Sequence, residues 1–421
     1  MSFETISVVG LGYIGLPTAA MFASRKKQVI GVDVTQSTVD TINRGEIHIV
    51  EPDLDMIVHA AVMEGYLKAV TTPEAADAFL IAVPTPFSET TENEIPQPDL
   101  KYIEAASRSI APVLKKGDLV VLESTSPVGA TEQMAEWLAK ARPDLSFPQN
   151  AGEKADINVA HCPERVLPGH VVRELVENDR VIGGMTSRCS ERCVELYGTF
   201  VKGECVITNA RTAEMAKLTE NSCRDVQIAF ANELSVICDK LDINVWELIS
   251  LANRHPRINI LQPGPGVGGH CIAVDPWFIV STTPNEARII HTARIVNDAK
   301  PEWVLDKIKV SITDYLQDNP QKSVKDVTVA CYGLAFKPDI DDLRESPAMS
   351  ITESLAKLHA GKVVAVEPNI EIDEDFPDIE LMTFGEAKKL ADVHVLLVDH
   401  KEFQAESFKS NYLVDTKGIW K

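Results

Sequence analysis

The fold is decided by the stretch Thr5-Ile-Ser-Val-Val-Gly-Leu-Gly-Tyr-Ile-Gly15, which the helix-forming residues 16–24 continue. A short apolar strand leads into a G-x-G-x-x-G turn and a helix, and a second strand, residues 28–33, then ends in an acid. Glycines permit the tight turn and let a pyrophosphate approach the N-terminus of the helix, where the dipole favours an anion. This order is typical of a doubly wound α/β domain that binds a dinucleotide.

The acid that ends the second strand, Asp33, indicates which dinucleotide is bound. Its carboxylate accepts hydrogen bonds from ribose hydroxyls and repels a 2′-phosphate, and no Lys or Arg follows it closely. We therefore expect NAD rather than NADP. The glycine pattern alone is weak evidence, but the strand before it and the acid after it make it specific. The residues expected to bind the cofactor here are Gly10, Gly12, Tyr13, Ile14, Gly15 and Asp33.

The α/β pattern continues with apolar runs at residues 78–83 and 118–122, a segment at 155–161 that leads into Cys162-Pro-Glu-Arg165, and a short strand at 179–183. Continuous apolar runs are typical of parallel strands that are buried on both faces. Pro84 and Thr85 follow the first run, at the carboxyl end where ligands lie in open α/β sheets, and are further cofactor candidates. Glu123-Ser-Thr-Ser-Pro-Val-Gly129 follows the second run in the same way.

The pattern changes at about Thr212. Residues 212–241 contain neither Pro nor Gly and carry an apolar stripe at helical spacing, which predicts one helix of some thirty residues. Such long helices connect domains or form dimer interfaces, and we expect a homodimer. Further helices are expected at residues 245–253, 286–298 and 301–317. The stripe consists of Met215, Leu218, Val226, Phe230, Leu234 and Ile237.

The last hundred residues return to α/β alternation, with expected strands at 326–333, 362–368 and 393–399 and a helix at 347–359. This resembles a second Rossmann-like unit without the G-x-G-x-x-G turn. The chain is therefore expected to be an α/β protein with an N-terminal Rossmann domain, a central long-helix domain and a C-terminal Rossmann-like domain. The expected boundaries are 1–205, 206–318 and 319–421.

Composition excludes several classes of protein. A length of 421 residues suggests two or three domains, and 45% hydrophobic with 24% charged residues is ordinary for a globular chain. A formal charge of −21 argues against nucleic-acid or membrane binding. The eight cysteines form no C-x-x-C pair and no zinc spacing, so we expect reduced thiols and no metal site. No apolar run is long enough to span a membrane and no leader pattern opens the chain, so a cytoplasmic location is expected.

The segment Gly264-Pro-Gly-Val-Gly-Gly-His-Cys-Ile-Ala-Val-Asp275 places a single thiol, Cys271, directly after a glycine-rich turn. A thiol in that position is suited to attack a ligand, because glycines let the backbone come close to it. The alternative is a flexible loop that holds a buried cysteine, since free cysteines are among the most buried residues.

Six motifs stand in one order along the chain: Gly10–Gly15, Glu123–Gly129, Cys162-Pro-Glu-Arg165, Glu214-Met-Ala-Lys-Leu-Thr-Glu-Asn221, Gly264–Asp275 and Gly333–Arg344. The set spans nearly the whole chain and resembles the UDP-sugar 6-dehydrogenase family, the enzymes similar to UDP-glucose and GDP-mannose dehydrogenases. The Gly-Gly-His-Cys form of the cysteine motif resembles the branch that acts on N-acetylated sugars, because the UDP-glucose branch usually has Ser before Cys.

The resemblance implies NAD-dependent four-electron oxidation of the C6 hydroxyl of a UDP-N-acetylhexosamine to the uronic acid. UDP-N-acetyl-D-mannosamine is the expected sugar, with UDP-N-acetylglucosamine or UDP-glucose as alternatives. It also implies a place in the synthesis of bacterial surface polysaccharide such as the enterobacterial common antigen. Such chemistry needs two hydride transfers, and the intermediate aldehyde becomes a hydride donor only after a nucleophile adds to it. A thiolate of Cys271 supplies that nucleophile, through a thiohemiacetal and a thioester.

The resemblance also assigns roles to other side chains. Lys217 and Asn221 lie four apart on the long helix, hence on one face, and are expected to contact the oxygen of the reacting carbon. Asp275 resembles the carboxylate that activates or orients water, and Thr125 resembles a contact near the nicotinamide. Glu164, followed by Arg165, resembles the active-site glutamate that also binds substrate. The glucose enzymes carry a second acid four residues later, where this chain has Pro168.

Basic side chains are the candidates for binding the diphosphate. Arginine suits bidentate phosphate contacts, so Arg254 and Arg257 are expected to clamp it. Arg344 is expected at the cofactor edge, unless it forms a salt bridge to Asp341 or Asp342. His270 either shapes the sugar pocket or packs in the core. The substrate-binding candidates are Glu164, Arg165, Lys217, Asn221, Arg254, His255, Arg257, Gly264, Gly268, His270, Phe336 and Lys337.

Two alternatives from other classes remain open at this point. A two-electron β-hydroxyacid dehydrogenase shares the Rossmann domain and long helices but needs neither the cysteine nor a third α/β domain. A catalytically silent regulator that binds a UDP-sugar would lack Cys271 or Lys217, and both are present.

Overall fold

The structure, a computed structural model, describes residues 3–88, 94–167, 169–269, 271–371, 376, 379–406 and 409–420. The chain forms two compact units. The N-terminal unit contains Met1–Glu220 and Trp277–Thr283, and the C-terminal unit contains Asn221–Pro276 and Pro284–Lys421.

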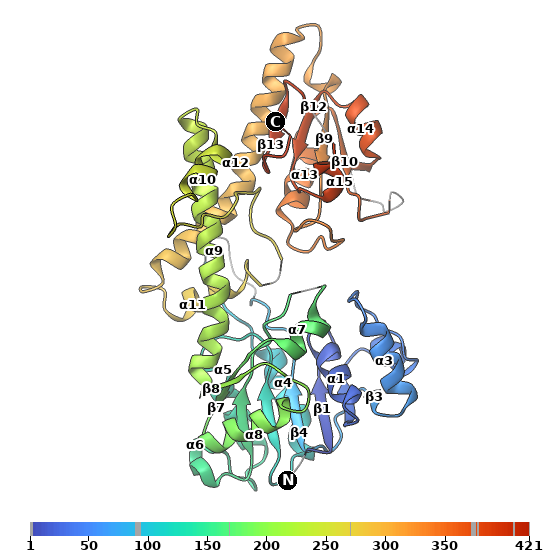
Figure 1. Ribbon diagram of the computed structural model, residues 1–421, viewed down its shortest axis with the longest axis vertical. Coiled ribbons are helices and arrows are strands. Elements are labelled where there is room, and N and C mark those ends of the chain that lie inside the picture. The colour runs from blue at the N-terminus through green and yellow to red at the C-terminus, as the bar shows by residue number, and fades with distance from the viewer. Residues whose placement is uncertain are drawn as a thin grey trace. The chain divides into compact units, whose positions relative to one another are not determined.

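The N-terminal unit is built on an eight-stranded sheet in the order β3-β2-β1-β4-β5-β6-β7-β8 (Figure 1). Neighbouring strands run parallel except β6 and β7, which are antiparallel. The strands are β1 (Thr5–Val9), β2 (Gln28–Val32), β3 (Leu67–Val70), β4 (Ala78–Ile81), β5 (Leu119–Leu122), β6 (Asn158–His161), β7 (Arg180–Gly184) and β8 (Cys205–Asn209). The helices are α1 (Gly15–Ser24), α2 (Gln36–Asn43), α3 (Leu54–Met63), α4 (Lys101–Ile110), α5 (Ala130–Ala141), α6 (Pro148–Ala151), α7 (Val171–Glu177) and α8 (Ser187–Tyr197).

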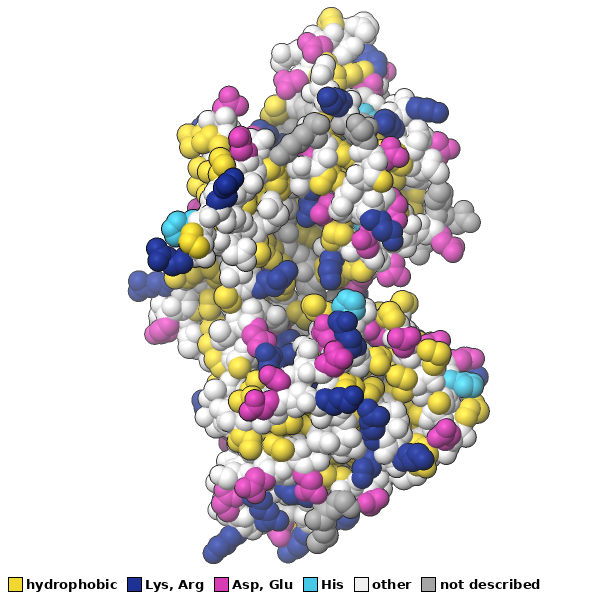
Figure 2. All heavy atoms as spheres, in the orientation of Figure 1, with side chains coloured by type: hydrophobic (Ala, Val, Ile, Leu, Met, Phe, Trp, Pro, Cys, Tyr) yellow, Lys and Arg dark blue, Asp and Glu magenta, His cyan; other side chains and the backbone are white. Residues whose placement is uncertain are grey.

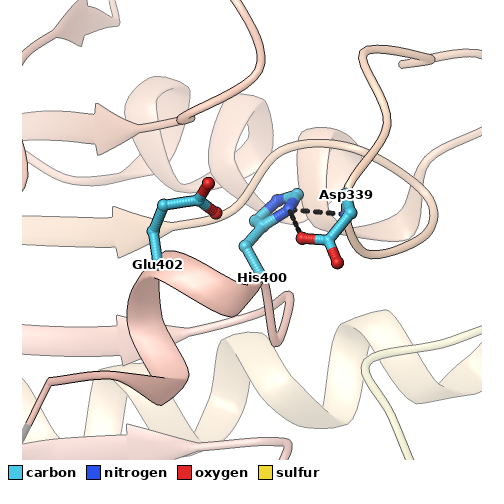
Figure 3. A group of neighbouring side chains, drawn as sticks. All are labelled: Asp339, His400 and Glu402. Atoms are coloured by element: carbon cyan, nitrogen blue, oxygen red, sulfur yellow. Dashed lines mark hydrogen bonds and ion pairs between the residues drawn. The ribbon is translucent and has the colours of Figure 1, made fainter.

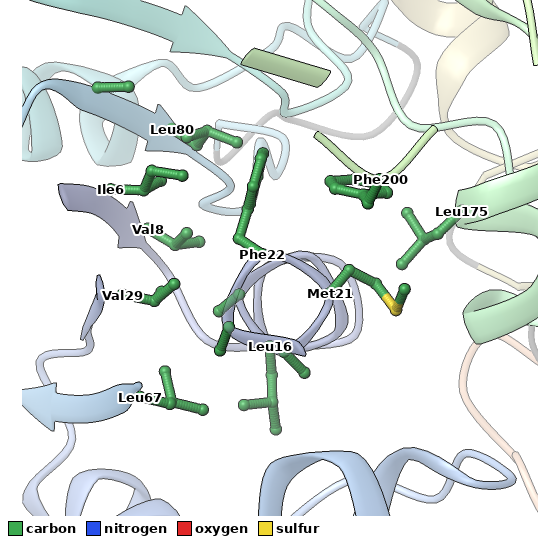
Figure 4. Close-up of a cluster of buried hydrophobic side chains, with 14 of the residues drawn as sticks. Ile6, Val8, Leu16, Met21, Phe22, Val29, Leu67, Leu80, Leu175 and Phe200 are labelled. Atoms are coloured by element: carbon green, nitrogen blue, oxygen red, sulfur yellow. The ribbon is translucent and has the colours of Figure 1, made fainter. Parts of the chain in front are cut away.

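Two hydrophobic clusters pack on this sheet. One gathers residues of α1, α3, α7 and α8, and the other gathers residues of α4 and α5. In the first, Phe22 of α1 is fully buried and meets the ring of Phe200 edge-on at a centroid distance of 4.8 Å. Figure 4 shows α1 with its apolar side chains pointing into this cluster among residues of the central strands. The cluster holds the glycine turn between β1 and α1 in a fixed position.

The helices of the central segment differ from expectation at two points, an unpredicted helix at Asp275–Thr282 and the continuity of the helix around Pro301. The expected long helix is confirmed as α9 (Ala210–Lys240), and α10 (Val245–Ala252) follows it. α11 (Asp275–Thr282) precedes α12 (Arg288–Asp318), which runs on through Pro301 as a single helix. The expectation of two helices, 286–298 and 301–317, was therefore wrong. Proline removes one backbone hydrogen bond, but buried side chains beyond it, such as Val304 and Ile308, hold the helix in the core.

The C-terminal sheet has five parallel strands in the order β11-β10-β9-β12-β13. They are β9 (Thr328–Tyr332), β10 (Lys362–Val366), β11 (Glu380–Leu381), β12 (Val393–Leu396) and β13 (Leu413–Asp415), with helices α13 (Pro347–Leu358), α14 (Phe384–Leu390) and α15 (Lys401–Gln404). This confirms the Rossmann-like C-terminal segment and, with the rest, the expected α/β class. The boundaries 1–205, 206–318 and 319–421 stay predictions.

Acidic and basic side chains are mixed on the face drawn in Figure 2, although the net charge of the chain is −21. Positive charge therefore has to gather locally wherever an anion binds. No helix among the described residues is both long and apolar enough to cross a membrane.

Candidate active site

The glycine turn after β1 has the geometry of a phosphate cradle. Gly10 has φ +93°, and a Cβ on Gly15 would lie 1.8 Å from the carbonyl oxygen of Gly10, so both positions exclude a side chain. A Cβ on Gly12 would meet no heavy atom within 4 Å, which leaves its backbone open to a ligand. Tyr13 is exposed, and Ile14 stands at the N-cap of α1. The turn thus fits a pyrophosphate at the start of α1.

Asp33 is held rigidly at the carboxyl end of β2. One carboxylate oxygen accepts the backbone N–H of Leu11 at 3.1 Å, and the other accepts the backbone N–H of Thr35 at 2.9 Å. Each oxygen keeps a second lone pair, so the carboxylate can still accept hydrogen bonds from ribose hydroxyls. The position and chemistry of Asp33 therefore fit NAD.

Polar atoms lacking partners mark the carboxyl end of β4 and β5. Pro84 and Thr85 follow β4, and the hydroxyl of Thr85 is buried without a protein hydrogen bond. Thr125 is half-buried after β5, and the hydroxyl of its neighbour Ser126 is also buried without a partner. Buried hydroxyls normally have partners, so these two are suited to a bound ligand. The sequence indicated Thr85 but gave no signal for Ser126.

Glu164 is 6% exposed, and both its oxygens are occupied. One accepts the backbone N–H of Arg165 at 2.7 Å, and the other accepts the guanidinium of Arg180 at 2.6 Å. The side chain of Arg165 forms an ion pair with Glu220, at 2.7 Å. Arg180 was not indicated by the sequence. Pro168 lies outside the described residues.

Lys217 is half-buried on α9, and its position depends on Glu214 one turn earlier. The carboxylate of Glu214 is buried and accepts the backbone N–H groups of Gly129 and Thr131, at 2.7 and 2.8 Å. It also accepts the hydroxyl of Thr131 at 2.6 Å, although burial raises the pKa of Glu214. Residues three apart share a helix face, so this cap fixes Lys217 relative to the Thr125 loop.

In the C-terminal unit, three predicted catalytic residues come together. Cys271 is exposed, and its carbonyl oxygen accepts the backbone N–H of Asp275 at 2.9 Å. Asp275 is 3% exposed, and its carboxylate accepts the side-chain amide of Asn221 at 2.5 Å. The thiol therefore stands one turn before a carboxylate whose orientation α9 fixes.

A buried hydrogen-bond chain holds the start of the glycine turn. The backbone N–H of Gly264 donates to Asn232 at 2.9 Å, and the amide of Asn232 donates to Asn297 at 2.9 Å. The amide of Asn297 then donates to Asp225 at 2.8 Å, and Arg294 pairs with the same carboxylate at 2.7 Å. Single polar residues on long helices usually face solvent, so the sequence did not indicate this series of buried hydrogen bonds.

A pocket of about 310 Å³ lies beside the glycine turn. Three cations, Arg224, Lys337 and Lys417, line it among apolar groups, which suits an anionic ligand with a flat apolar part. Of the predicted residues, Gly264, Phe336 and Lys337 line it, whereas Arg224 and Lys417 were not predicted. The other lining residues are Ile228, Leu261, Gln262, Pro263, Pro265, Gly266, Ala335, Pro338, Pro347, Ala348, Leu397 and Val398.

Gly268 packs tightly in the same region. A Cβ there would lie 2.3 Å from the carbonyl oxygen of Glu345 and 2.9 Å from the Cβ of Phe336. Only glycine therefore fits between the turn and the loop that carries Phe336 and Lys337. Gly268 shapes the region through its missing side chain.

Several predicted substrate residues lie elsewhere. Arg254, His255 and Arg257 are exposed after α10 and are not among the residues that line the pocket. Arg344 forms a two-point ion pair with Asp342, at 2.6 and 2.8 Å, as the alternative interpretation allowed. Its role at the cofactor edge stays a prediction, and His270 lies outside the described residues.

Asp339, His400 and Glu402 form a compact group with metal-binding side chains (Figure 3). The imidazole of His400 is already occupied, however. Its Nδ1 accepts the backbone N–H of Asp339 at 2.9 Å, so Nε2 carries the proton and faces Glu367 at 3.1 Å. Glu367 in turn accepts the backbone N–H of Leu334 at 2.7 Å, in the turn after β9. The group therefore fixes loops of the C-terminal sheet.

Three successive segments of the chain match the three domains of one protein family. Residues 4–201 match the NAD binding domain of the UDP-glucose/GDP-mannose dehydrogenase family, residues 211–299 its central domain and residues 330–421 its UDP binding domain. The chain belongs to this family. It is an NAD-dependent dehydrogenase of UDP-sugars, and the expected cofactor and substrate class are confirmed.

Relatives of this UDP-sugar dehydrogenase are similar over their full length. It is 66% identical to the UDP-N-acetyl-D-mannosamine dehydrogenase of Yersinia pestis, over 100% of both chains. It is 62% identical to an NDP-N-acetyl-D-galactosaminuronic acid dehydrogenase of Ralstonia nicotianae, over 100% of this chain and 97% of that one. The solved UDP-D-ManNAc dehydrogenase of Pyrococcus horikoshii is 36% identical with a TM-score of 0.85, over 99% of this chain and 96% of that one.

Asp33 generates the first prediction. The dehydrogenase should use NAD with a kcat/KM at least about tenfold above that for NADP, because the carboxylate repels a 2′-phosphate. Asp33→Ser should narrow this ratio by weakening NAD use and relieving the repulsion. Initial rates with both cofactors measure the ratio. Equal or better kcat/KM with NADP in the unaltered protein would contradict the assignment.

Proposed function

We propose that the protein oxidises the C6 hydroxyl of UDP-N-acetyl-D-mannosamine to the uronic acid. The carrying observation is the group of Cys271, Asp275 and Asn221, which joins a nucleophile to an oriented carboxylate. The choice of sugar is supported by relatives named for this substrate at 64–66% identity. A role in bacterial surface polysaccharide synthesis is part of the same proposal.

The cofactor site follows from the N-terminal unit. Gly10, Gly12 and Gly15 cradle the pyrophosphate, and Asp33 binds the adenosine ribose. NAD, when bound, supplies the hydride acceptor, twice for each sugar. The hydroxyl of Thr85, buried without a protein partner, is available to hold the cofactor in place.

Cys271 carries the covalent part of the reaction. Its thiolate adds to the C6 aldehyde, forming a C–S bond while the carbonyl electron pair moves to oxygen as an alkoxide. Loss of hydride from this thiohemiacetal gives a thioester. Water then attacks the thioester carbonyl, the C–S bond breaks, and the thiolate is released together with the carboxylate and two protons. The exposed position of Cys271 on a turn held by glycines suits repeated attack and release.

Charge on the reacting oxygen is the task of α9. Lys217 supplies a cation that stabilises each alkoxide or oxyanion, and preorganised cations of this kind lower barriers by several kcal/mol, on the order of 3. Asn221 holds the carboxylate of Asp275 at 2.5 Å, which orients it to accept a proton from the attacking water. Glu164 contributes a fixed negative charge, and Thr125 a hydroxyl, beside the cofactor.

A second sugar keeps the same chemistry. The relative from Ralstonia nicotianae is named for an N-acetylgalactosaminuronic acid, so a different epimer is the principal alternative. A catalytically silent UDP-sugar-binding regulator is the alternative of a different class. Turnover of any UDP-sugar would exclude the silent regulator.

We also propose that the protein is a cytoplasmic homodimer. Scattered cysteines without paired spacing are typical of reducing compartments. Large apolar side chains remain exposed along α9 and around α10, and contiguous exposed apolar surface is typical of an interface. These are Phe230 (52% exposed), Ile237 (45%), Leu241 (61%), Ile243 (46%) and Leu251 (58%).

The stoichiometry tests the four-electron reaction. A panel of UDP-sugars with excess NAD should give two NADH per UDP-N-acetyl-D-mannosamine, with smaller kcat/KM for UDP-N-acetylglucosamine and UDP-glucose. The end-point absorbance of NADH measures this directly. One NADH per sugar with accumulation of aldehyde would refute the covalent second step, and no turnover on any sugar would favour the regulator.

Substitution of the nucleophile separates the two oxidation steps. Cys271→Ser should lower steady-state turnover at least about 100-fold, because a hydroxyl is a far weaker nucleophile than a thiolate. Sugar and NAD binding, measured by calorimetry, should stay within about threefold. Cys223→Ser is the matched control, since Cys223 is another exposed thiol, on α9. Near-normal acid production by Cys271→Ser would show that Cys271 is structural.

Light scattering tests the dimer. The protein should have twice the mass of one chain at micromolar concentration, and Ile237→Glu should shift it toward the monomer, because a buried charge is costly at an apolar interface. Glu233→Gln, at an exposed polar position of the same helix, should leave the mass unchanged. A monomer in the unaltered protein would refute the proposal.

A further inference from the structure

A buried group of charges lies behind Glu164 in the N-terminal unit. Arg180, at the start of β7, is 2% exposed and donates to Glu164 at 2.6 Å. A second carboxylate, Glu123, is 1% exposed and lies 4.0 Å from the same guanidinium nitrogen. Glu123 follows β5 and Glu164 follows β6, so both stand at the carboxyl end of adjacent strands, where ligands of such sheets lie.

Aromatic and hydroxyl groups close the space around these charges. The guanidinium of Arg180 lies over the ring of Tyr197, 5.0 Å from its centroid. The Tyr197 hydroxyl donates to Glu123 at 2.9 Å, and the hydroxyl of Thr18, on α1, lies 3.5 Å from the same oxygen. The other carboxyl oxygen of Glu123 is buried with no hydrogen-bond partner.

The charge count inside this group does not balance if both carboxyls are ionised. One guanidinium cannot neutralise two buried carboxylates, and a second buried charge without its own partner is unfavourable. Burial, and then the charge of Glu164, raise the pKa of Glu123 to about 8. Burial also raises the pKa of the other titratable neighbours, Tyr197 and Cys193, which stay neutral. Cys162 lies within hydrogen-bond reach of Cys193.

We propose that Arg180 and Glu123 are positioning residues for Glu164. With an uncharged Glu123, the guanidinium of Arg180 has one carboxylate to pair with, that of Glu164, while its other terminal nitrogen donates to the carbonyl of Leu175. The role of Glu164 beside the cofactor rests on the proposed function. When Glu123 loses its proton, the second carboxylate competes for Arg180, and the hold on Glu164 weakens. The placement of Glu164 therefore depends on the proton of Glu123, a residue that does not contact the reacting atoms.

The effect on stability has a definite sign. The pKa of Glu123 is about 8 in the folded protein, against 4.5 for an ordinary glutamate. Between pH 4.5 and about 8, Glu123 therefore keeps its proton in the folded state but has released it in the unfolded chain. The associated stability is fully present below pH 4.5 and is lost as pH rises through about 8. Glu123→Gln removes this dependence, because the amide has the shape of the protonated acid and does not ionise.

The first experiment compares pH profiles of kcat for the full-length protein and Glu123→Gln, each normalised to its own value at pH 7. The ratio of variant to unaltered protein should rise at least about threefold between pH 7 and pH 9.5, following a single ionisation near 8. Glu104→Gln, in an exposed ion pair with Arg108, is the matched control and should give a flat ratio. Superimposable profiles for Glu123→Gln would overturn the proposal.

Melting temperatures provide a readout that does not depend on turnover. The melting temperature of Glu123→Gln minus that of the unaltered protein should become more positive from pH 5 to pH 9. A difference that stays constant would show that Glu123 does not hold a proton. If the unaltered protein released only one NADH per sugar, the proposed reaction would fail while this comparison still decided the state of Glu123.

Arg180 is tested by graded substitution. Arg180→Met should lower kcat at least about tenfold with the Kd for NAD, measured by calorimetry, within about threefold, and Arg180→Lys should recover part of the loss. A purely structural arginine would instead lower the melting temperature and the folded fraction and leave kcat per folded molecule unchanged. That result would overturn the positioning role.

Discussion

The architecture of the N-terminal unit depends on the carboxylate of Glu214, which accepts two backbone N–H groups and a hydroxyl at the start of α5. A buried carboxylate is stable only when hydrogen bonds replace its lost water, and a helix N-terminus supplies them at low cost. Because Glu214 belongs to α9, the same contact fixes the first turns of that helix against the start of α5. Lys217, one turn further, inherits its position from that contact.

The same device explains why the two Rossmann-like sheets differ in what they bind. Each carries an acid at the end of its second strand, Asp33 after β2 and Glu367 after β10. Glu367 accepts two N–H groups of its glycine turn, those of Leu334 and Ala335, and also faces His400. Asp33 accepts only the N–H of Leu11 in its own turn and leaves Gly12 open. Glu367 thus occupies two N–H groups of the C-terminal turn, and a pocket lies instead beside Gly264 and Lys337.

Elements with a repeated apolar pattern were predicted from the sequence, whereas single buried polar residues were missed. An apolar run before a glycine turn predicted β1, and an apolar stripe at helical spacing predicted α9 to within two residues, because burial repeats along such elements. Pro301 misled the boundary of α12, since packing outweighed one lost hydrogen bond. Arg180, Asn232 and Lys417 gave no signal, because a single polar side chain looks the same whether its partner is water or a residue far along the chain. Their partners are set by topology, which no local pattern encodes.

The surroundings of Cys271 favour one of the two interpretations of its segment, a reactive turn rather than a flexible loop around a buried thiol. The loop interpretation requires a buried thiol, but the thiol of Cys271 is exposed. Three described positions of the segment are also held by contacts: Gly264 donates to Asn232, Gly268 packs against the backbone of Glu345, and Asp275 accepts from Asn221. A nucleophile must approach carbon within a narrow range of geometry, and a free loop would spend most of its time elsewhere. Glycines here therefore serve close packing more than motion, and they hold an exposed thiol in one place.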